Sequence, residues 1–229
     1  MVNAFNPDAD IELPARTRGL IDRRAKLLGP AYRLFYRRPV HIVRGVGTRL
    51  WDDNGDEYLD AYNNVVSAGH ANPHVVQAVQ RQMETLCTHT RYLHDGILDY
   101  AEELRATVDS PLADGHLMLT CTGSEANDLA LRIAKHHTGH RGIIVTSEAY
   151  HGNSDLTASF SPSLGEGSPL GAWVRRVPTP DSYRIDPADL TRRFVTAVRD
   201  QIEDLQRHGE GLAAFIVDSL FSSDGIFSE

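Results

Sequence analysis

The sequence is poor in lysine, with Lys26 and Lys135 as the only two among 229 residues. Any chemistry that needs a lysine amine therefore has two candidates in this chain. Lys26 belongs to an N-terminal arm, and Lys135 falls in the middle of an expected helix.

Cysteine is equally scarce. Cys87 and Cys121 form no CxxC pair and have no histidine at the spacing of a metal ligand set. This excludes a disulfide framework and argues against a zinc site. We expect two reduced thiols in the hydrophobic core and no bound metal.

Long apolar runs and excess positive charge are also missing. No stretch approaches the roughly 18 apolar residues of a membrane span, and the N-terminus lacks the basic start and apolar centre of an export signal. The formal net charge is −8, which disfavours non-specific nucleic-acid binding. These features predict a cytosolic protein that binds neither nucleic acid nor membrane.

The first part of the chain has the pattern of an arm followed by a small sheet. Residues 20–28 favour a short helix, and residues 40–62 alternate as a β-meander with a tight turn at Asn54–Gly55. We expect residues 1–60 to form the arm and meander, and residues 61–229 to form an incomplete portion of a larger cofactor-binding domain.

Apolar residues then recur at helical spacing in residues 73–86, which open on a proline, and in residues 97–108. Residues 116–122 predict a strand, residues 125–137 a helix and residues 142–147 a second strand. Short apolar strands that alternate with an amphipathic helix indicate parallel pairing.

The rest of the chain continues this alternation. Residues 160–187 are rich in Ser, Pro and Gly and predict a long irregular excursion, followed by a helix over residues 187–208 and a buried strand over residues 212–218. The chain stops soon after that strand, which suggests a fragment or a natural truncation. The sequence does not distinguish between the two.

The segment TCTGSEAN, residues 120–127, joins an expected strand to an expected helix through one Gly-Ser step. Thr122 and Glu125 have the spacing of a capping box, which would explain the segment as a helix start alone. The step also lies where parallel sheets bind ligands, and the amides of Gly123 and Ser124 could hold a phosphate. P-loop and dinucleotide fingerprints are both missing, so a cofactor with one terminal phosphate, such as pyridoxal 5′-phosphate, fits best.

The segment EAYHGNS, residues 148–154, follows the next expected strand. Tyr150 could stack on a planar pyridine, and Gly152 would let the backbone pass close to it. Alone, such a segment is more often ordinary loop packing. Because this segment lies one strand–helix–strand crossover after TGSEAN, the two segments together are a strong indication of a cofactor site.

These motifs together resemble the class-III aminotransferases, which are fold-type-I pyridoxal-phosphate enzymes. The resemblance covers about residues 38–225, and the texture of GSEANDLALR and TRYLHD is most similar to a subgroup of phospholyases that act on amino-alcohol phosphates. It implies an α/β fold with a mostly parallel central sheet flanked by helices, here truncated. It also implies a homodimer.

The resemblance assigns expected roles to five positions. Gly123 and Ser124 would bind the cofactor phosphate, Tyr150 would lie against the pyridine, and His151 would sit by the ring or its phenolic oxygen. A core histidine is an equal alternative for His151. Asp218 stands near the cofactor, where many members of the family have Glu.

Substrate contacts are implied more weakly. Asn63 and Asn64 match a segment that approaches the substrate, and Arg91, Tyr92 and His94 match one near a shared active site. Surface or interface packing is the alternative for each. The family has a second glutamate five positions after the first that gates an arginine, and Ser223 replaces it here. This change fits a different or phosphate-bearing substrate.

The implied activity is transfer of an amino group from an amine or amino acid to a keto acid. Elimination of phosphate from an amino-alcohol phosphate is the first alternative, and a non-catalytic paralogue is the second. The aspartate that pairs with the pyridine nitrogen and the lysine that holds the cofactor would both lie after Glu229. We therefore expect the 229-residue chain to be inactive by itself.

Overall fold

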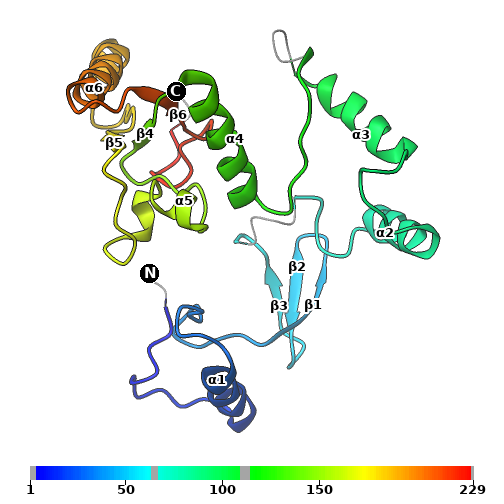
Figure 1. The fold of residues 1–229 in the computed structure, drawn as a ribbon. Helices are drawn as coiled ribbons and strands as arrows, with labels where there is room; N and C mark the ends of the chain where they lie inside the picture. Colours follow the sequence, from blue (N-terminus) through cyan, green and yellow to red (C-terminus); the bar gives the residue numbers. More distant parts are fainter. Residues whose placement is uncertain (1–3, 63–66, 109–113, 228–229) are drawn as a thin grey trace. The chain divides into compact units, whose positions relative to one another are not determined.

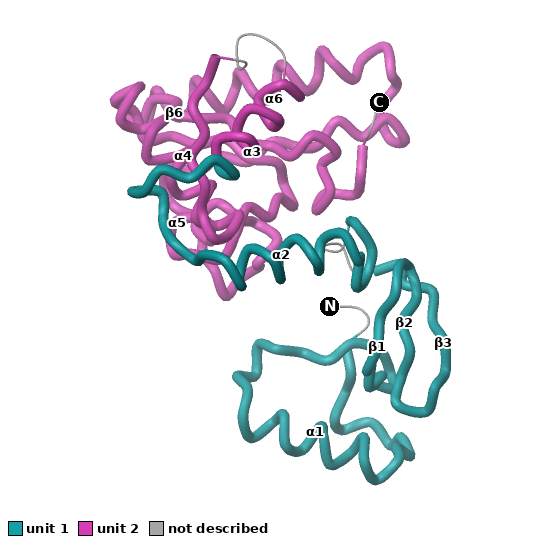
Figure 2. The backbone as a smooth tube through the Cα atoms, turned by 90° about the vertical axis from the view of Figure 1, so that its right-hand side faces the viewer, with its two compact units in different colours: residues 1–97 teal, residues 98–229 magenta. Residues whose placement is uncertain are grey.

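A computed structural model describes residues 4–62, 67–108 and 114–227. It divides into two compact units, Met1–Ile97 and Leu98–Glu229, which are described separately (Figure 2). The expected organisation around residue 60 stays a prediction, because two compact units by themselves do not test it.

The first unit contains the expected arm and meander. Helix α1 spans Ala15–Leu27, and strands β1 (Ile42–Val46), β2 (Arg49–Asp52) and β3 (Glu57–Leu59) form an antiparallel sheet in that order (Figure 1). The turn after β2 is built by the Asp52 carboxylate, which accepts from the amides of Asn54 and Asp56. Gly55 adopts a φ of 90°, which glycine tolerates best. The predicted meander and its turn are confirmed.

Helix α2 (Pro73–Thr85) begins where the sequence predicts, with Pro73 in its first turn. The Asn72 side chain caps the helix by accepting from the amides of His74 and Val75. Helix α3 (Asp95–Arg105) follows and crosses the boundary between the units. The structure confirms both helices.

The second unit is a parallel sheet with helices on both faces. Strand β4 (Gly142–Thr146) lies between β5 (Val174–Val177) and β6 (Leu212–Phe215), and both pairings are parallel. Helices α4 (Gly123–Thr138) and α6 (Pro187–Arg207) pack against this sheet, and α5 (Asp155–Ala158) and a 3-10 turn η2 (Pro162–Leu164) precede β5.

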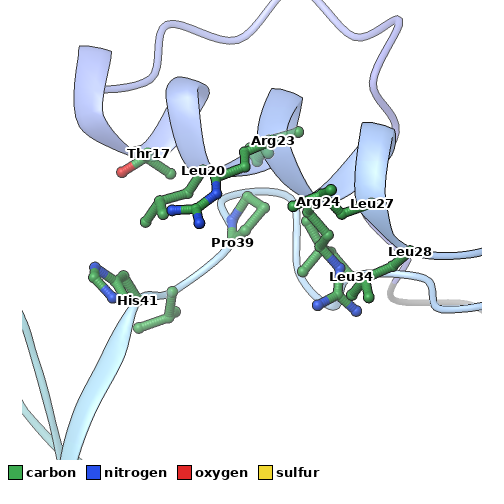
Figure 3. A pocket seen from close by; sticks show the side chains of 11 residues that line it. Thr17, Leu20, Arg23, Arg24, Leu27, Leu28, Leu34, Pro39 and His41 are labelled. Carbon is green, nitrogen blue, oxygen red and sulfur yellow. The ribbon is translucent and has the colours of Figure 1, made fainter.

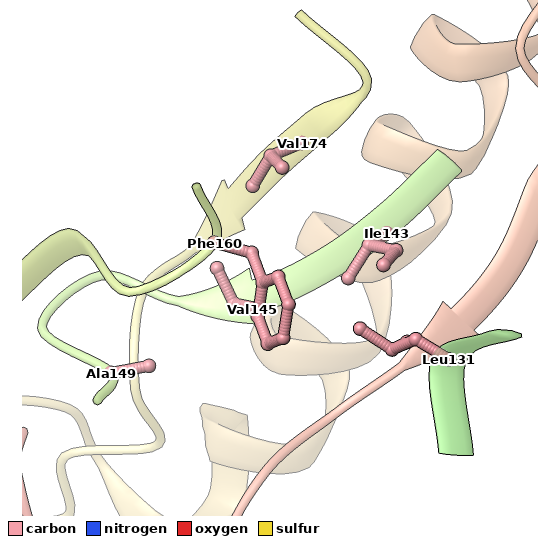
Figure 4. Packing of buried hydrophobic residues seen from close by; sticks show 6 residues of the cluster. All are labelled: Leu131, Ile143, Val145, Ala149, Phe160 and Val174. Atoms are coloured by element: carbon pink, nitrogen blue, oxygen red, sulfur yellow. The ribbon is translucent and has the colours of Figure 1, made fainter. Parts of the chain in front are cut away.

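The core is built on alternate sides of β4. Ile143 and Val145 pack with Leu131 of α4 and with Phe160, as Figure 4 shows. Ile144 points to the other face, where it packs with Leu205 of α6. Full burial of such a side chain is worth about 1.5–3 kcal/mol, so β4 is the main anchor of this unit.

Two expectations about strands are wrong. Residues 116–122 form no strand, and Met118 and Leu119 are 64% and 55% exposed. A strand requires a hydrogen-bonded neighbour, and no strand pairs with this segment within the described residues. In contrast, residues 160–187, expected to be irregular, contain β5. The two central residues of β5, Arg175 and Arg176, break the apolar pattern that indicates a strand. All four residues of β5 nevertheless pair with β4.

The cysteines are free, as expected, but both Cys87 and Cys121 are exposed. The expectation of core thiols is therefore wrong. Cys121 directly follows the segment 116–120, which has no strand partner in the described part of the chain, so nothing there covers it. Across the described residues, no group of His, Cys, Asp and Glu side chains could hold a metal ion, and no helix is long and apolar enough to span a membrane.

Candidate cofactor site

The Gly-Ser step begins helix α4. The Thr122 hydroxyl accepts from the Glu125 amide at 3.1 Å, as expected of a capping residue. The Glu125 carboxylate accepts from the amide of Cys121 at 2.8 Å, one residue before the expected partner. A reciprocal capping box would require Glu125 to accept from the Thr122 amide, so that expectation is wrong. The Glu125 carboxylate reaches past Thr122 and accepts from the Cys121 amide instead.

This arrangement leaves two amides at the helix start without an acceptor. Within the described part of the chain, no hydrogen bond involves the Gly123 or Ser124 N–H. A Cβ at Gly123 would meet no atom within 4 Å, so the turn is open. Two free amides at the positive end of a helix of 16 residues suit an anion.

The loop after β4 lies directly against this turn. The Ser124 hydroxyl accepts from the Asn153 amide and donates to the Asn153 side-chain oxygen, both at 3.2 Å. Gly152 has a φ of 135°, and a Cβ there would stand 2.6 Å from the Ser124 hydroxyl. The backbone at Gly152 therefore passes close to the start of α4, and its expected approach to a cofactor ring stays a prediction.

Tyr150 and His151 occupy this loop in different environments. Tyr150 is 48% exposed, whereas His151 is 8% exposed and packs against Phe160 in a tilted arrangement with ring centroids 5.7 Å apart. The His151 Nε2 atom is buried and has no hydrogen-bond partner among the described residues. His151 is thus both a core histidine and a group with one unused polar atom.

The pKa of His151 depends on its burial and on the charges of two carboxylates. Burial lowers the pKa of the His151 imidazole, and the carboxylates of Asp218 and Asp224 oppose this effect. Asp218 itself is bound within its own loop, where it accepts from the amides of Leu220 and Ser222 and from the Ser222 hydroxyl. Burial raises the pKa of the Asp218 carboxyl, but these hydrogen bonds, Ser222 first, outweigh it and lower the pKa overall.

Asp224 is a residue that the sequence reasoning missed. Its carboxylate accepts from the Thr146 hydroxyl at 2.6 Å and from the Glu148 amide at 2.7 Å. It therefore ties the segment after β6 to the carboxyl end of β4. These contacts join residues more than 70 positions apart, and no local pattern in the sequence signals such a pairing.

The structure thus brings Gly123, Ser124 and His151 into one site, with Tyr150 on its loop and Asp218 coupled to His151. Arg91 and Tyr92 lie in the other unit, where Tyr92 is 66% exposed and stacks on His89. Their contact with substrate stays a prediction. Asn63 and Asn64 lie outside the described residues.

A separate pocket in the first unit contains none of these residues (Figure 3). It lies between α1 and the segment 34–41, and its lining is mainly apolar with Arg23, Arg24 and His41 at its edges. Nothing in its lining resembles a phosphate site built on main-chain amides. The α4 turn is therefore the better candidate for cofactor binding.

Comparison with known proteins settles the family. The model of aminotransferase class-III matches residues 35–229. The chain belongs to the class-III aminotransferase family. It is 37% identical to an alanine–glyoxylate aminotransferase 2-like protein of Drosophila melanogaster, over 90% of this chain and 43% of that protein.

Solved structures agree with this assignment. A phospholyase from Arthrobacter in complex with phosphoethanolamine is 43% identical with a TM-score of 0.83, over 88% of this chain and 48% of that one. A taurine:2-oxoglutarate aminotransferase from Bifidobacterium kashiwanohense, in complex with PLP and glutamate, shares the fold at 19% identity and a TM-score of 0.71, over 92% and 49%. The chain spans about half the length of each of these three proteins.

Proposed function

We propose that this chain supplies the phosphate-binding side of a pyridoxal 5′-phosphate site. The observation that carries the proposal is the contact between Ser124 and the Gly152–Asn153 backbone, which joins an open helix start to a loop that bears an aromatic ring. The free amides of Gly123 and Ser124 would hold the phosphate, Tyr150 would cover the ring and His151 would lie beside it. Family membership supports this cofactor.

When bound, the cofactor supplies an aldehyde that condenses with amines and a cationic ring that withdraws electrons from the substrate carbon. The residues of this chain bind and orient it. The α4 amides would fix the phosphate end, and burial of His151, which outweighs the opposing charges of Asp218 and Asp224, favours a neutral imidazole that can donate or accept one hydrogen bond. The Asp224 carboxylate holds the start of the loop that carries this imidazole, through the Glu148 amide.

For the whole protein we propose amino transfer from an amine or amino acid to a keto acid, which is the chemistry that names the family. Elimination of phosphate from an amino-alcohol phosphate is the second candidate. It is favoured by the 43% identity to a phospholyase seen with phosphoethanolamine and by Ser223 at the position of the family's gating glutamate. We keep Arg91 and Tyr92 as proposed substrate contacts.

The cofactor proposal is tested by calorimetry on the chain. Pyridoxine 5′-phosphate, which lacks the reactive aldehyde, is compared with pyridoxine, which also lacks the phosphate. We expect the phosphorylated compound to bind at least about tenfold more tightly, because the helix amides recognise the phosphate. Equal affinities would refute a phosphate site at α4.

The activity is tested on the whole protein. Release of inorganic phosphate from phosphoethanolamine is measured beside keto-acid formation from a panel of amino acids. Keto-acid formation without phosphate release supports the aminotransferase, and the reverse supports the phospholyase. The absence of both would contradict the proposed function.

We further propose a cytosolic homodimer. Helix α2 supports the dimer, because Val75, Val79 and Met83 recur on the helix and are 48–68% exposed. Such a face is commonly covered by another chain. A sedimentation experiment that gives a monomer at micromolar concentration would contradict the dimer.

A further inference from the structure

One face of α4 holds the loop that carries Tyr150 and His151. Ser124, Asn127 and Asp128 are spaced by three and four residues, so they project from the same side of the helix. Each contacts a different point on the loop. Ser124 binds Asn153, the Asn127 amide donates to the His151 carbonyl at 2.7 Å, and Asp128 accepts from the Ser154 hydroxyl at 2.6 Å.

Asn127 has the central place among these contacts. Its side chain binds the backbone between Tyr150 and Gly152, which is the point where the proposed ring-binding residues attach. The opposite side of the same residue is also held, because the His151 N–H donates to the buried Ser161 hydroxyl at 2.9 Å. The backbone of His151 is therefore fixed from two sides before any ligand binds.

The other two contacts do not replace this one. Asn153 and Ser154 lie on the far side of Gly152, whose φ of 135° marks a bend in the backbone. The contacts at Ser124 and Asp128 thus hold the loop after the bend, whereas Asn127 holds it before the bend. Among the described residues, the Asn127 side chain makes the only hydrogen bond between α4 and the segment that carries Tyr150 and His151.

We infer that Asn127 is a positioning residue that sets the separation between the phosphate-binding turn and the ring-binding loop. Asn127 belongs to α4 itself, so its amide transmits the position of the Gly123–Ser124 turn to His151 through one hydrogen bond. A ligand with both a phosphate and a ring needs that separation to be correct. A ligand with phosphate alone needs only the turn. This inference rests on the proposed cofactor site.

The test compares two ligands on Asn127→Leu, which keeps the approximate size of the side chain and removes its donor. The full 229-residue chain is titrated with pyridoxine 5′-phosphate and with inorganic phosphate. We expect the variant to bind pyridoxine 5′-phosphate on the order of tenfold more weakly, the usual value of one well-made hydrogen bond, with phosphate affinity unchanged. His136→Ala, an exposed position on the same helix, is the control and should change neither affinity.

A purely structural role for Asn127 would weaken both ligands together or neither, and either result would overturn the inference. If Asn127→Leu does not fold by circular dichroism, Asn127→Ser provides the same comparison with a small polar side chain. Wild-type chain that binds neither ligand would contradict the proposed cofactor site and the inference with it. Wild-type chain that binds both, with unchanged affinities in the variant, would overturn the inference alone.

Discussion

The close approach of the loop to α4 requires a residue without a side chain at Gly152. A Cβ at this position would stand 2.6 Å from both the Ser124 and the Thr157 hydroxyl oxygens, and its φ of 135° is strained for any other residue. We expect Gly152→Ala to lower the free energy of unfolding by about 1–3 kcal/mol, because overpacking and backbone strain act together. Urea denaturation measures this loss.

Gly167→Ala is the matched control for that prediction. A Cβ at Gly167 would meet no atom within 4 Å, and the residue does not adopt a positive φ. The control should unfold at nearly the same urea concentration as the wild type. If Gly152→Ala and Gly167→Ala unfold alike, the close contact between the loop and α4 is not present in solution.

His151 gives the second prediction at this scale. Burial lowers its pKa in the folded state below the value in the unfolded chain, so the unfolded chain binds the proton more tightly. Stability from this residue is therefore present above pH about 6.5 and is lost as the pH falls from there through the folded pKa. In His151→Gln, the difference in unfolding free energy between pH 7.5 and pH 5 should be smaller than in the wild type.

All other histidines are the same in the wild type and the variant, so the comparison isolates His151. The charges of Asp218 and Asp224 oppose the shift, and the lowered pKa of Asp218 keeps that carboxylate ionised over this range. An identical pH dependence in wild type and variant would show that His151 is not buried as a neutral ring. At the residue scale, the sequence indicated the cap at Thr122 because capping depends on local backbone chemistry, whereas the cofactor roles of Gly123 and Ser124 stay predictions.

The elements themselves were predicted unevenly, for a physical reason. Helices α4 and α6 carry their signals locally, in caps and in apolar spacing, and both were found from the sequence. Strands depend on partners. Strand β5 was missed because Arg175 and Arg176 break its apolar pattern, and residues 116–122 look like a strand but have no neighbour in the described structure. Only pairing distinguishes these two segments.

The start of α4 allows a test at the scale of the element. Thr122→Ala removes the oxygen that accepts from the Glu125 amide. We expect a loss of about 1 kcal/mol in unfolding free energy, the usual cost of deleting a helix N-cap. Thr196→Ala, the same change at an exposed position within α6, should have little effect because alanine favours a helix interior. Equal effects of both changes would show that Thr122 does not cap the helix.

At the scale of the whole molecule, the site is divided among distant parts of the sequence. Its phosphate turn and its loop are local motifs, which is why the sequence alone indicated a cofactor. Asp224 reaches Thr146 and Glu148 across more than 70 residues, which no local motif signals. The chain also spans about half the length of its relatives, so the complete activity is a property to be tested in the whole protein.

Pyridoxal 5′-phosphate should bind this chain without forming a specific bond to lysine. Lys135 follows Gly123 by 12 residues on α4, which places it about 18 Å along the helix axis from the phosphate turn. Its amine lies 4.2 Å from the centre of the Trp173 ring, and burial lowers its pKa, which increases the unprotonated fraction of this amine. Distance, rather than protonation, should therefore prevent the reaction.

Borohydride reduction followed by peptide mass spectrometry measures this outcome. Lys26 and Lys135 should carry only low labelling, and excess pyridoxine 5′-phosphate should not reduce it, because the competitor occupies the α4 turn and not the lysines. Labelling of Lys135 that approaches one group per chain and disappears with the competitor would place that amine within reach of the bound aldehyde. The α4 amides would then not be the phosphate site, since a helix holds its two ends at a fixed separation.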